Sequence, residues 1–287
     1  MRESLDVGDL GKANLILIDR GCQALAQDRM LLEALRNDGK VIFLGESLAD
    51  DNVIDLLRGA NLDHLIGDAS APSSELLVTS VKLLSGDLFG LEKYLSWGVT
   101  VHEHAVSTYA EKRDALGAVA GHARGIGGRR SVVTRIESVA DELLMNALYD
   151  APAARDGIGA VTRIQSAGGI GSMVADRAAL IRFAADGKTF ALSVQDEYGE
   201  LKKDMILDHL ARARSEGGRP RPQNDPRSGA GLGLYFILSS VTRFIANVDT
   251  GSRTEIICLF DLDRVEENAR GAQSLHIFTQ DSITAAA

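Results

Sequence analysis

The sequence contains little cysteine and no long uninterrupted hydrophobic run. Its two cysteines, Cys22 and Cys258, stand far apart in a chain of 287 residues. Such a pair offers neither a disulfide framework nor a metal-ligand spacing, so we expect buried thiols in a reducing compartment. The most hydrophobic stretch, residues 232–248, is interrupted by two serines, a threonine and an arginine. It is too short and too polar to span a bilayer.

Positive charge is also scarce, because 31 basic residues face 40 acidic ones and the net charge is −9. Nucleic acids and anionic membranes attract cationic surfaces, so this balance argues against either as a partner. The first residues carry no apolar segment of the kind found in signal peptides. We therefore expect a cytoplasmic globular protein that binds neither nucleic acid nor membrane.

Short apolar runs alternate with helical patterns over residues 1–90. These runs and patterns lie, in alternation, at residues 15–18, 22–36, 41–44, 53–58, 62–66 and 73–84. Short buried strands that alternate with helices are typical of crossover units in a parallel sheet. This region is predicted to be an α/β unit, with residues 73–84 as an amphipathic helix.

The pattern changes near residue 99, where strands and helices no longer alternate one by one. Predicted strands lie at residues 100–104, 178–183, 189–194, 244–248 and 254–260, and predicted helices at 109–124, 131–149, 200–214 and 235–241. Asp186-Gly187 is a strong hairpin signal, whereas residues 217–226 are too rich in proline and glycine for regular structure. We predict an α/β sandwich over residues 91–262, a mixed sheet layered on helices. The tail, residues 263–287, can add an edge strand at 275–278.

Three segments carry residues suited to a phosphate, its cation and a base. Glu142 and Asn146 are four residues apart on one helix face, and their oxygens suit magnesium, although such pairs are also common on solvated surfaces. Residues 229–234 are rich in glycine and open a helix, a pattern that suits close approach to phosphate and also occurs in flexible turns. Asp196 ends a predicted strand, where it can accept a hydrogen bond from an amine or simply form a turn.

The order and spacing of these segments, followed by Thr254 on the closing strand, resemble the GHKL ATPase family. This family includes gyrase, the histidine kinases and the anti-sigma-factor serine kinases. The resemblance covers residues 100–262 and implies ATP and Mg²⁺ as cofactors. It implies that Asn146 binds the metal, that Glu142 is the general base, and that Asp196, supported by Thr254, accepts from the adenine amino group. It places the remaining nucleotide contacts at Gly199, Gly229, Gly231, Leu232 and Gly233.

The sequence departs from the family pattern at two places. Tyr198 and Glu200 stand where the first glycine box carries glycines, and Gly199 lies between them. Asp150 stands where related kinases often carry a basic residue or histidine. An added acid near the phosphates would favour more cation or weaker nucleotide binding.

No histidine lies in the two-helix hairpin context that histidine kinases place before the ATPase domain. His102 and His104 fall in a predicted strand, and His122 falls in a helix of the ATPase region. The arrangement looks most like the anti-sigma-factor branch, which implies a Ser/Thr protein kinase acting on a partner regulator. A non-catalytic ATP-gated adaptor in a two-component-like pathway is the alternative, and a histidine kinase is a third interpretation.

Residues 1–90 resemble a truncated receiver domain of response regulators, from its third strand onward. Asp19 stands where the phosphoacceptor would be, but Gly45 and Gly67 stand at or near the usual Ser/Thr and Lys positions. With little to hold magnesium or neutralise a phosphoryl group, the sequence argues against phosphorylation of Asp19. The region is interpreted as a pseudo-receiver that docks a partner or forms a homodimer.

Overall fold

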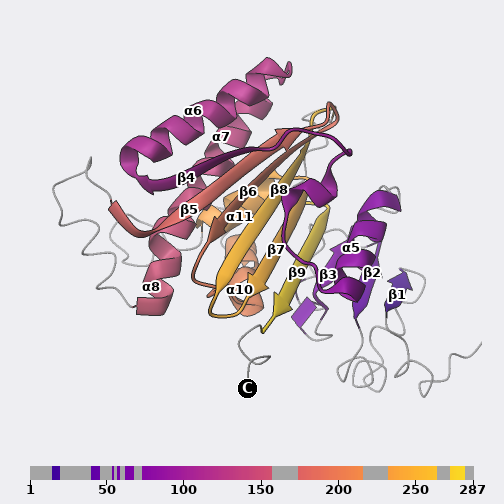
Figure 1. Ribbon diagram of the computed structural model, residues 1–287. Helices are drawn as coiled ribbons and strands as arrows, with labels where there is room; N and C mark the ends of the chain where they lie inside the picture. Colours follow the sequence, from indigo (N-terminus) through magenta and orange to yellow (C-terminus); the bar gives the residue numbers. More distant parts are fainter. Residues whose placement is uncertain are drawn as a thin grey trace, which may run out of the picture.

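The computed structural model describes residues 15–19, 40–45, 54, 57–58, 62–67, 73–156, 174–215, 232–263 and 272–281. Within these ranges nine strands form one mixed sheet, in the order β1-β2-β3-β9-β7-β8-β6-β5-β4 (Figure 1). The predicted α/β fold class is confirmed.

The N-terminal strands are parallel, as the alternation of strands and helices predicts. β1 (Ile16–Asp19) pairs with β2 (Val41–Leu44), and β2 pairs with β3 (His64–Ile66). Ile18, Phe43 and Leu65 lie in register on one buried face. The helix that follows, α5 (Ser73–Ser85), matches the predicted helix at residues 73–84.

The remaining strands are mostly antiparallel and include the predicted hairpin. They are β4 (His102–Thr108), β5 (Val174–Ala185), β6 (Thr189–Asp196), β7 (Arg243–Asp249) and β8 (Arg253–Asp261). β5 and β6 are joined at Asp186-Gly187, where Gly187 has a φ of 89°. The Asp186 carboxylate closes this turn by accepting the backbone N–H groups of Lys188 and Thr189.

The C-terminal strand β9 (Ser274–Gln280) corrects one expectation from the sequence. The tail does form a strand, but it is not at an edge: β9 lies between β3, to which it is antiparallel, and β7, to which it is parallel. Leu275, Ile277 and Phe278 are all buried, so both faces of the strand are covered. Strands from residues 1–90 and 91–262 therefore share one sheet; the division of the chain into domains stays a prediction.

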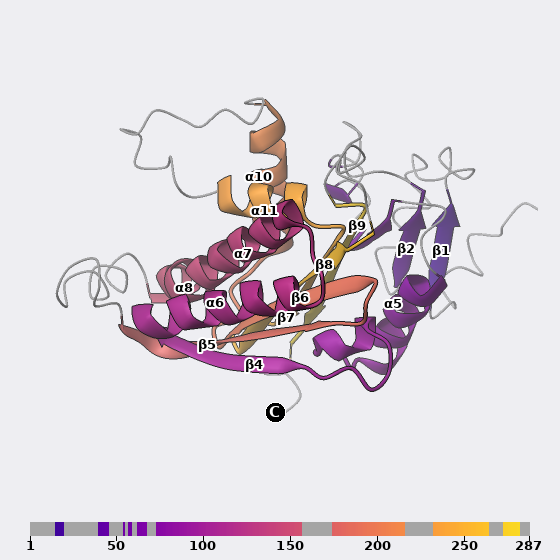
Figure 2. The same ribbon diagram turned by 90° about the horizontal axis from the view of Figure 1, so that it is seen from above.

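Helices cover both faces of the sheet (Figure 2). One face carries α6 (Tyr109–Gly125), α7 (Arg130–Met145), α10 (Lys203–Ser215) and α11 (Leu232–Ser240); the other carries α5 and the short 3₁₀ helix η2 (Leu91–Tyr94). A π-helical turn η3 (Asn146–Asp150) and α8 (Ala151–Asp156) continue α7.

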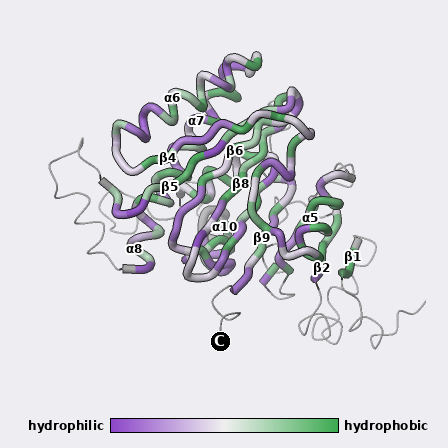
Figure 3. The backbone as a smooth tube through the Cα atoms, in the orientation of Figure 1, coloured by the Kyte–Doolittle hydropathy of each residue, from purple (hydrophilic) through white to green (hydrophobic). Residues whose placement is uncertain are grey.

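Side chains of the central strands alternate between the two faces, as the twofold period of a strand requires. On β8, Cys258 and Phe260 belong to the core under α6 and α7, whereas Ile257 and Leu259 face the opposite side. Cys258 is fully buried, as predicted. Figure 3 shows these hydrophobic central strands beside the more hydrophilic edge strand β4. No helix in the described ranges is long and apolar enough to cross a membrane.

Candidate functional site

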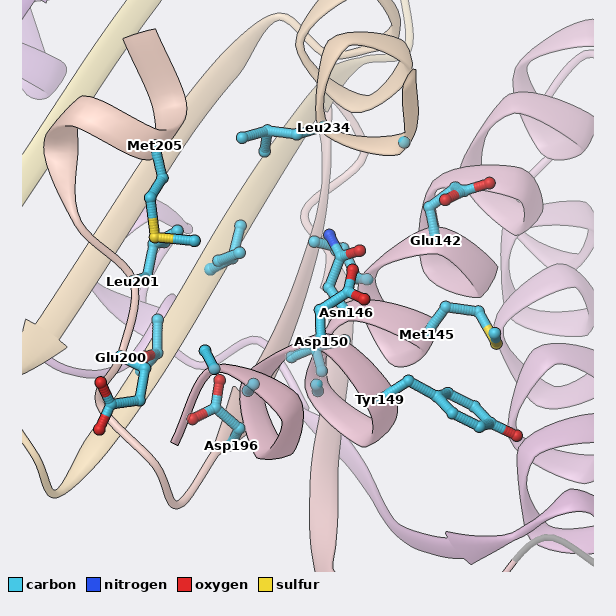
Figure 4. A pocket seen from close by; sticks show the side chains of 18 of the residues that line it. Glu142, Met145, Asn146, Tyr149, Asp150, Asp196, Glu200, Leu201, Met205 and Leu234 are labelled. Atoms are coloured by element: carbon cyan, nitrogen blue, oxygen red, sulfur yellow. The ribbon is translucent and has the colours of Figure 1, made fainter. Parts of the chain in front are cut away.

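A cavity of about 450 Å³ opens between the helix layer and the ends of β6 and β8 (Figure 4). This volume falls within the range of roughly 300–1,000 Å³ that is usual for small-molecule sites. The predicted site residues that line it are Glu142, Asn146, Asp196, Gly233 and Thr254. Residues more than a hundred positions apart in the sequence therefore meet at one cavity.

One wall is a polar stripe along the end of α7 and the turn η3. Glu142, Asn146 and Asp150 follow one another at steps of four residues, and all three line the cavity. Leu144 and Leu148, on the opposite side of this helix, are buried in the core and fix its orientation. Figure 4 shows the side chains of Asn146 and Asp150 together on the helical wall of the cavity. π-helical turns are rare and occur frequently at functional sites.

The Glu142 carboxylate has an electrostatic setting suited to proton transfer. Burial raises its pKa, and the nearby carboxylates of Asp141 and Asp150 raise it further, while the Lys112 ammonium lowers it. Lys112 forms an ion pair with Asp141, with 2.6 Å between the Lys112 nitrogen and the Asp141 carboxylate oxygen. A carboxylate with a raised pKa is a stronger base at neutral pH than an ordinary glutamate.

The first turn of α11 forms the wall that faces this polar stripe. A Cβ added to Gly233 would collide with the Glu142 carboxylate and lie 3.9 Å from the Asn146 amide oxygen. The backbone at Gly233 therefore lies so close to the Glu142 side chain that a residue with a Cβ would not fit without a shift. A helix start carries unpaired N–H groups and positive dipole, which favour an anion. Leu232 begins α11, whereas Gly229 and Gly231 lie outside the described residues.

Asp196 and Thr254 lie directly opposite each other on β6 and β8, at the far end of the cavity. One oxygen of Asp196 accepts the backbone N–H groups of Tyr198 and Gly199, at 2.8 and 3.3 Å. Burial outweighs these bonds and raises the pKa of Asp196 to about 6. Thr254 is 2% exposed, and its hydroxyl has no hydrogen-bond partner among the described residues. Because buried hydroxyls are normally paired, this one is available to a ligand or water in the cavity.

Gly199 is not among the residues that line the cavity. It contributes indirectly, because its backbone N–H donates to the Asp196 carboxylate. Its φ is +67°, and a Cβ there would lie 2.6 Å from the backbone nitrogen of Ser252. Its neighbour Tyr198 is buried, and Glu200 lines the cavity. Arg155 donates to the carbonyl oxygens of Tyr198 and Gly251, which ties α8 to this turn.

The apolar walls of the cavity were not predicted from the sequence. These are formed chiefly by Val194, Leu201, Met205, Leu234 and Ile256. His209 also lines the cavity, one turn after Met205 on α10. The four-residue spacing of Met205 and His209 was the signal available in the sequence, but it does not reveal which helix face meets the cavity.

The residues suit a magnesium ion that is shared with a ligand. Within the described ranges, no group of three or more His, Cys, Asp or Glu side chains could hold a metal by itself. Mg²⁺ is usually bound by one or two carboxylates together with substrate phosphates and waters. Asn146 and its acidic neighbours on the stripe supply this kind of oxygen set.

The three histidines considered in the sequence lie away from the cavity. His102 and His104 lie on β4 as predicted, and the rings of His102 and His122 are 4.6 Å apart, against Phe183. None of these three lines the cavity. Asp19 ends β1, and its side chain lies outside the described part of the chain.

Comparison with solved structures gives a distant structural resemblance. Neither a family model nor a curated protein matches the sequence. A chain in the crystal structure of the SiaB-SiaC complex from Pseudomonas aeruginosa is similar, with 16% sequence identity and a TM-score of 0.36. The match covers 63% of this chain and 98% of that one. This neighbour comes from a protein–protein complex.

Proposed function

We propose that this chain is an ATP-binding signalling protein of the GHKL type, a protein kinase that phosphorylates Ser or Thr on a partner regulator. The observation that carries the proposal is the convergence of three elements on one cavity. These are the Glu142–Asn146 helix, the glycine start of α11, and the Asp196–Thr254 strand pair. Each supplies chemistry that a magnesium nucleotide needs.

Recognition of adenine is assigned to the strand pair. The Asp196 oxygen that does not hold the Tyr198 turn can accept from the adenine amino group. Thr254 can complete the contact with its unpaired hydroxyl, directly or through a water. Val194 and Ile256 provide apolar surface for the ring beside these polar groups. A mainly apolar pocket with a few placed polar groups is typical of nucleotide sites.

Phosphoryl transfer is assigned to the opposite end of the cavity. Asn146 would hold the magnesium ion, which neutralises phosphate charge, and the N–H groups at the start of α11 would orient the phosphates. The substrate hydroxyl oxygen attacks the γ-phosphorus while the bond to the ADP oxygen breaks. Glu142 accepts the hydroxyl proton. Its raised pKa suits it to this task near neutral pH.

Incubation with labelled ATP and candidate partner proteins tests the proposed kinase. We expect transfer of label to Ser or Thr, and a loss of roughly 100-fold or more in Glu142→Gln with ATP affinity nearly unchanged. Glu137→Gln, on the exposed surface of the same helix, is the matched control. Tight ATP binding without transfer to any partner would count against the kinase.

A non-catalytic, ATP-gated adaptor is the second candidate. It is favoured by the turn after β6, where buried Tyr198 and cavity-lining Glu200 replace the glycines of the family pattern. In this case the N-terminal parallel strands would dock a partner or a second copy of the chain. The adaptor predicts nucleotide-dependent partner binding that survives Glu142→Gln, whereas loss of that binding in the variant would refute it.

A further inference from the structure

The cavity carries an excess of negative charge that its described walls do not balance. Its acidic lining residues are Asp141, Glu142, Asp150, Asp196 and Glu200. Among the described lining residues, His209 is the one side chain that can become a cation. A polyphosphate entering such a cavity is repelled unless cations enter with it.

The individual carboxylates differ in how they are compensated. Asp141 is paired with Lys112 at 2.6 Å, and Asp196 accepts backbone N–H groups. Asp150 has no hydrogen bond or ion pair with any residue in the described ranges. It is nevertheless fixed on the cavity wall, because the π-helical turn places it one turn beyond Asn146.

A further feature of the same cavity points to a ligand. The Thr254 hydroxyl is buried, its residue lines the cavity, and it has no hydrogen-bond partner among the described residues. Asp150 is exposed, but it lines the same cavity as this buried hydroxyl. Its neighbour Asn146 supplies a second oxygen on the same wall.

We propose that Asp150 and Asn146 together ligate the divalent cation, and that Asp150 makes nucleotide binding depend on that cation. The inference rests on the proposed nucleotide site and names what controls it. Without the cation, Asp150 repels the phosphates; with the cation, it becomes a ligand and holds the phosphates through the metal. One or two carboxylates plus substrate phosphates are the usual ligands of Mg²⁺.

ATP titrations of the full chain by calorimetry, in excess Mg²⁺ and in excess EDTA, test this inference. The measured quantity is the ratio of the two ATP affinities. We expect Asp150→Asn to reduce this ratio by about tenfold, because metal-free ATP is repelled less and the metal complex loses a ligand. Asp141→Asn, a cavity carboxylate already paired with Lys112, should leave the ratio unchanged.

A ratio in Asp150→Asn within twofold of wild type overturns the inference, and so does an equal change in both affinities. Wild-type protein that binds no ATP in either condition refutes the proposed function itself. If Asp150→Asn does not fold, Asp150→Ser replaces it. Manganese titration in the presence of ATP, followed by electron paramagnetic resonance, gives a second readout, in which the variant should bind Mn²⁺ about tenfold more weakly.

Discussion

The carboxylates of Asp196 and Glu142 line the same cavity in different environments. Asp196 lies at the strand end, buried and held by backbone N–H groups, and its pKa is raised to about 6. The pKa of Glu142 is raised as well, by burial and by Asp141, on a helix that faces the start of α11. The first setting suits a fixed acceptor of a hydrogen bond, and the second suits a base that exchanges a proton.

Asp196→Asn should make the folded protein more stable and weaken its binding of ATP. The folded pKa of about 6 lies above the ordinary 3.8, so wild-type protein loses stability as the pH rises from 3.8 through 6. The variant lacks this cost and should be more stable than wild type at pH 7 by about 3 kcal/mol, with little difference near pH 3. Thermal unfolding at both pH values measures this.

The same variant should bind ATP about 10–100-fold more weakly, because a charged hydrogen-bond acceptor for the adenine amino group is lost. Thr254→Ser, which keeps the hydroxyl on the opposite strand, is the control and should bind nearly as well as wild type. Unchanged ATP affinity in Asp196→Asn would remove this residue from the adenine contact.

The pH dependence of phosphoryl transfer should report the Glu142 carboxylate. A base with a raised pKa is protonated, and inactive, at a higher pH than an ordinary glutamate. The acidic limb of a plot of kcat/KM against pH should therefore lie above pH 4.5, the ordinary value. Residual activity in Glu142→Gln should lack that limb. An identical limb in both proteins would assign it to another group.

At the scale of elements, the site depends on tight backbone approaches that few side chains would tolerate. The turn after β6 brings Gly199 against the β7–β8 hairpin, and the Gly251 N–H donates to the Gly199 carbonyl at 3.1 Å. This contact positions the loop that holds Asp196. The glycine is therefore needed for shape as well as for any contact with a nucleotide.

Gly199→Ala should destabilise the protein by about 2–4 kcal/mol. The substitution combines a positive φ of +67° with a Cβ pressed against backbone atoms of the hairpin. Gly187→Ala is the matched control, because Gly187 also has a positive φ, +89°, but an added Cβ would meet nothing within 4 Å. The control should cost about 1 kcal/mol. Urea unfolding measures both, and equal losses would show that the close approach does not matter.

At the scale of the whole molecule, a buried polar layer ties α5 to the far strands of the sheet. Glu75 accepts from Arg243 Nε at 2.6 Å and lies 3.1 Å from His276 Nε2. Lys82 donates to Asn247 at 2.7 Å. These contacts join residues more than 160 positions apart, on β7 and β9. The N-terminal region is thus held to the remainder by specific polar contacts as well as by the shared sheet.

Acid should weaken this connection through Glu75. Burial alone would raise its pKa, but the hydrogen bond and charge of His276, together with Arg243, lower it from 4.5 to about 2. The ionised carboxylate therefore stabilises the fold above pH 4.5, and this contribution is lost as the pH falls towards 2.

Comparison of wild type with Glu75→Gln measures this effect. The stability advantage of wild type should shrink by about 3 kcal/mol between pH 5 and pH 2 in urea unfolding. Glu92→Gln, at an exposed glutamate, should show no such narrowing. A constant difference between wild type and Glu75→Gln across this range would mean that Glu75 is not ionised by its partners.

The sequence predicted what depends on neighbours along the chain. Helices, the Asp186-Gly187 hairpin and the helix carrying Glu142 and Asn146 follow from local periodicity and turn chemistry. The amphipathic pattern of α5 did not predict that a polar side of this helix is buried against the rest of the protein. On this helix Glu75, Thr79 and Lys82 are buried, whereas Leu77, Val81 and Leu84 are exposed.

The reason is physical, because the partners of the buried polar groups come from distant strands. Arg243, Asn247 and His276 lie far from α5 in the sequence, but in the fold they contact its buried side chains Glu75 and Lys82. The interior position of β9 was missed for the same reason, since strand order depends on long-range pairing. The role of Asp150 also emerges only when the charges around the cavity are seen together.

This cavity is proposed to bind ATP with magnesium between the Asn146 helix and the start of α11. Calorimetric titration of ATP in the presence of Mg²⁺, on wild type and Asn146→Ala, tests it most directly. We expect one ATP per chain in wild type and at least roughly tenfold weaker binding in the variant, since a metal ligand is removed. Equal affinity in the two proteins, or no binding by wild type, would contradict the account.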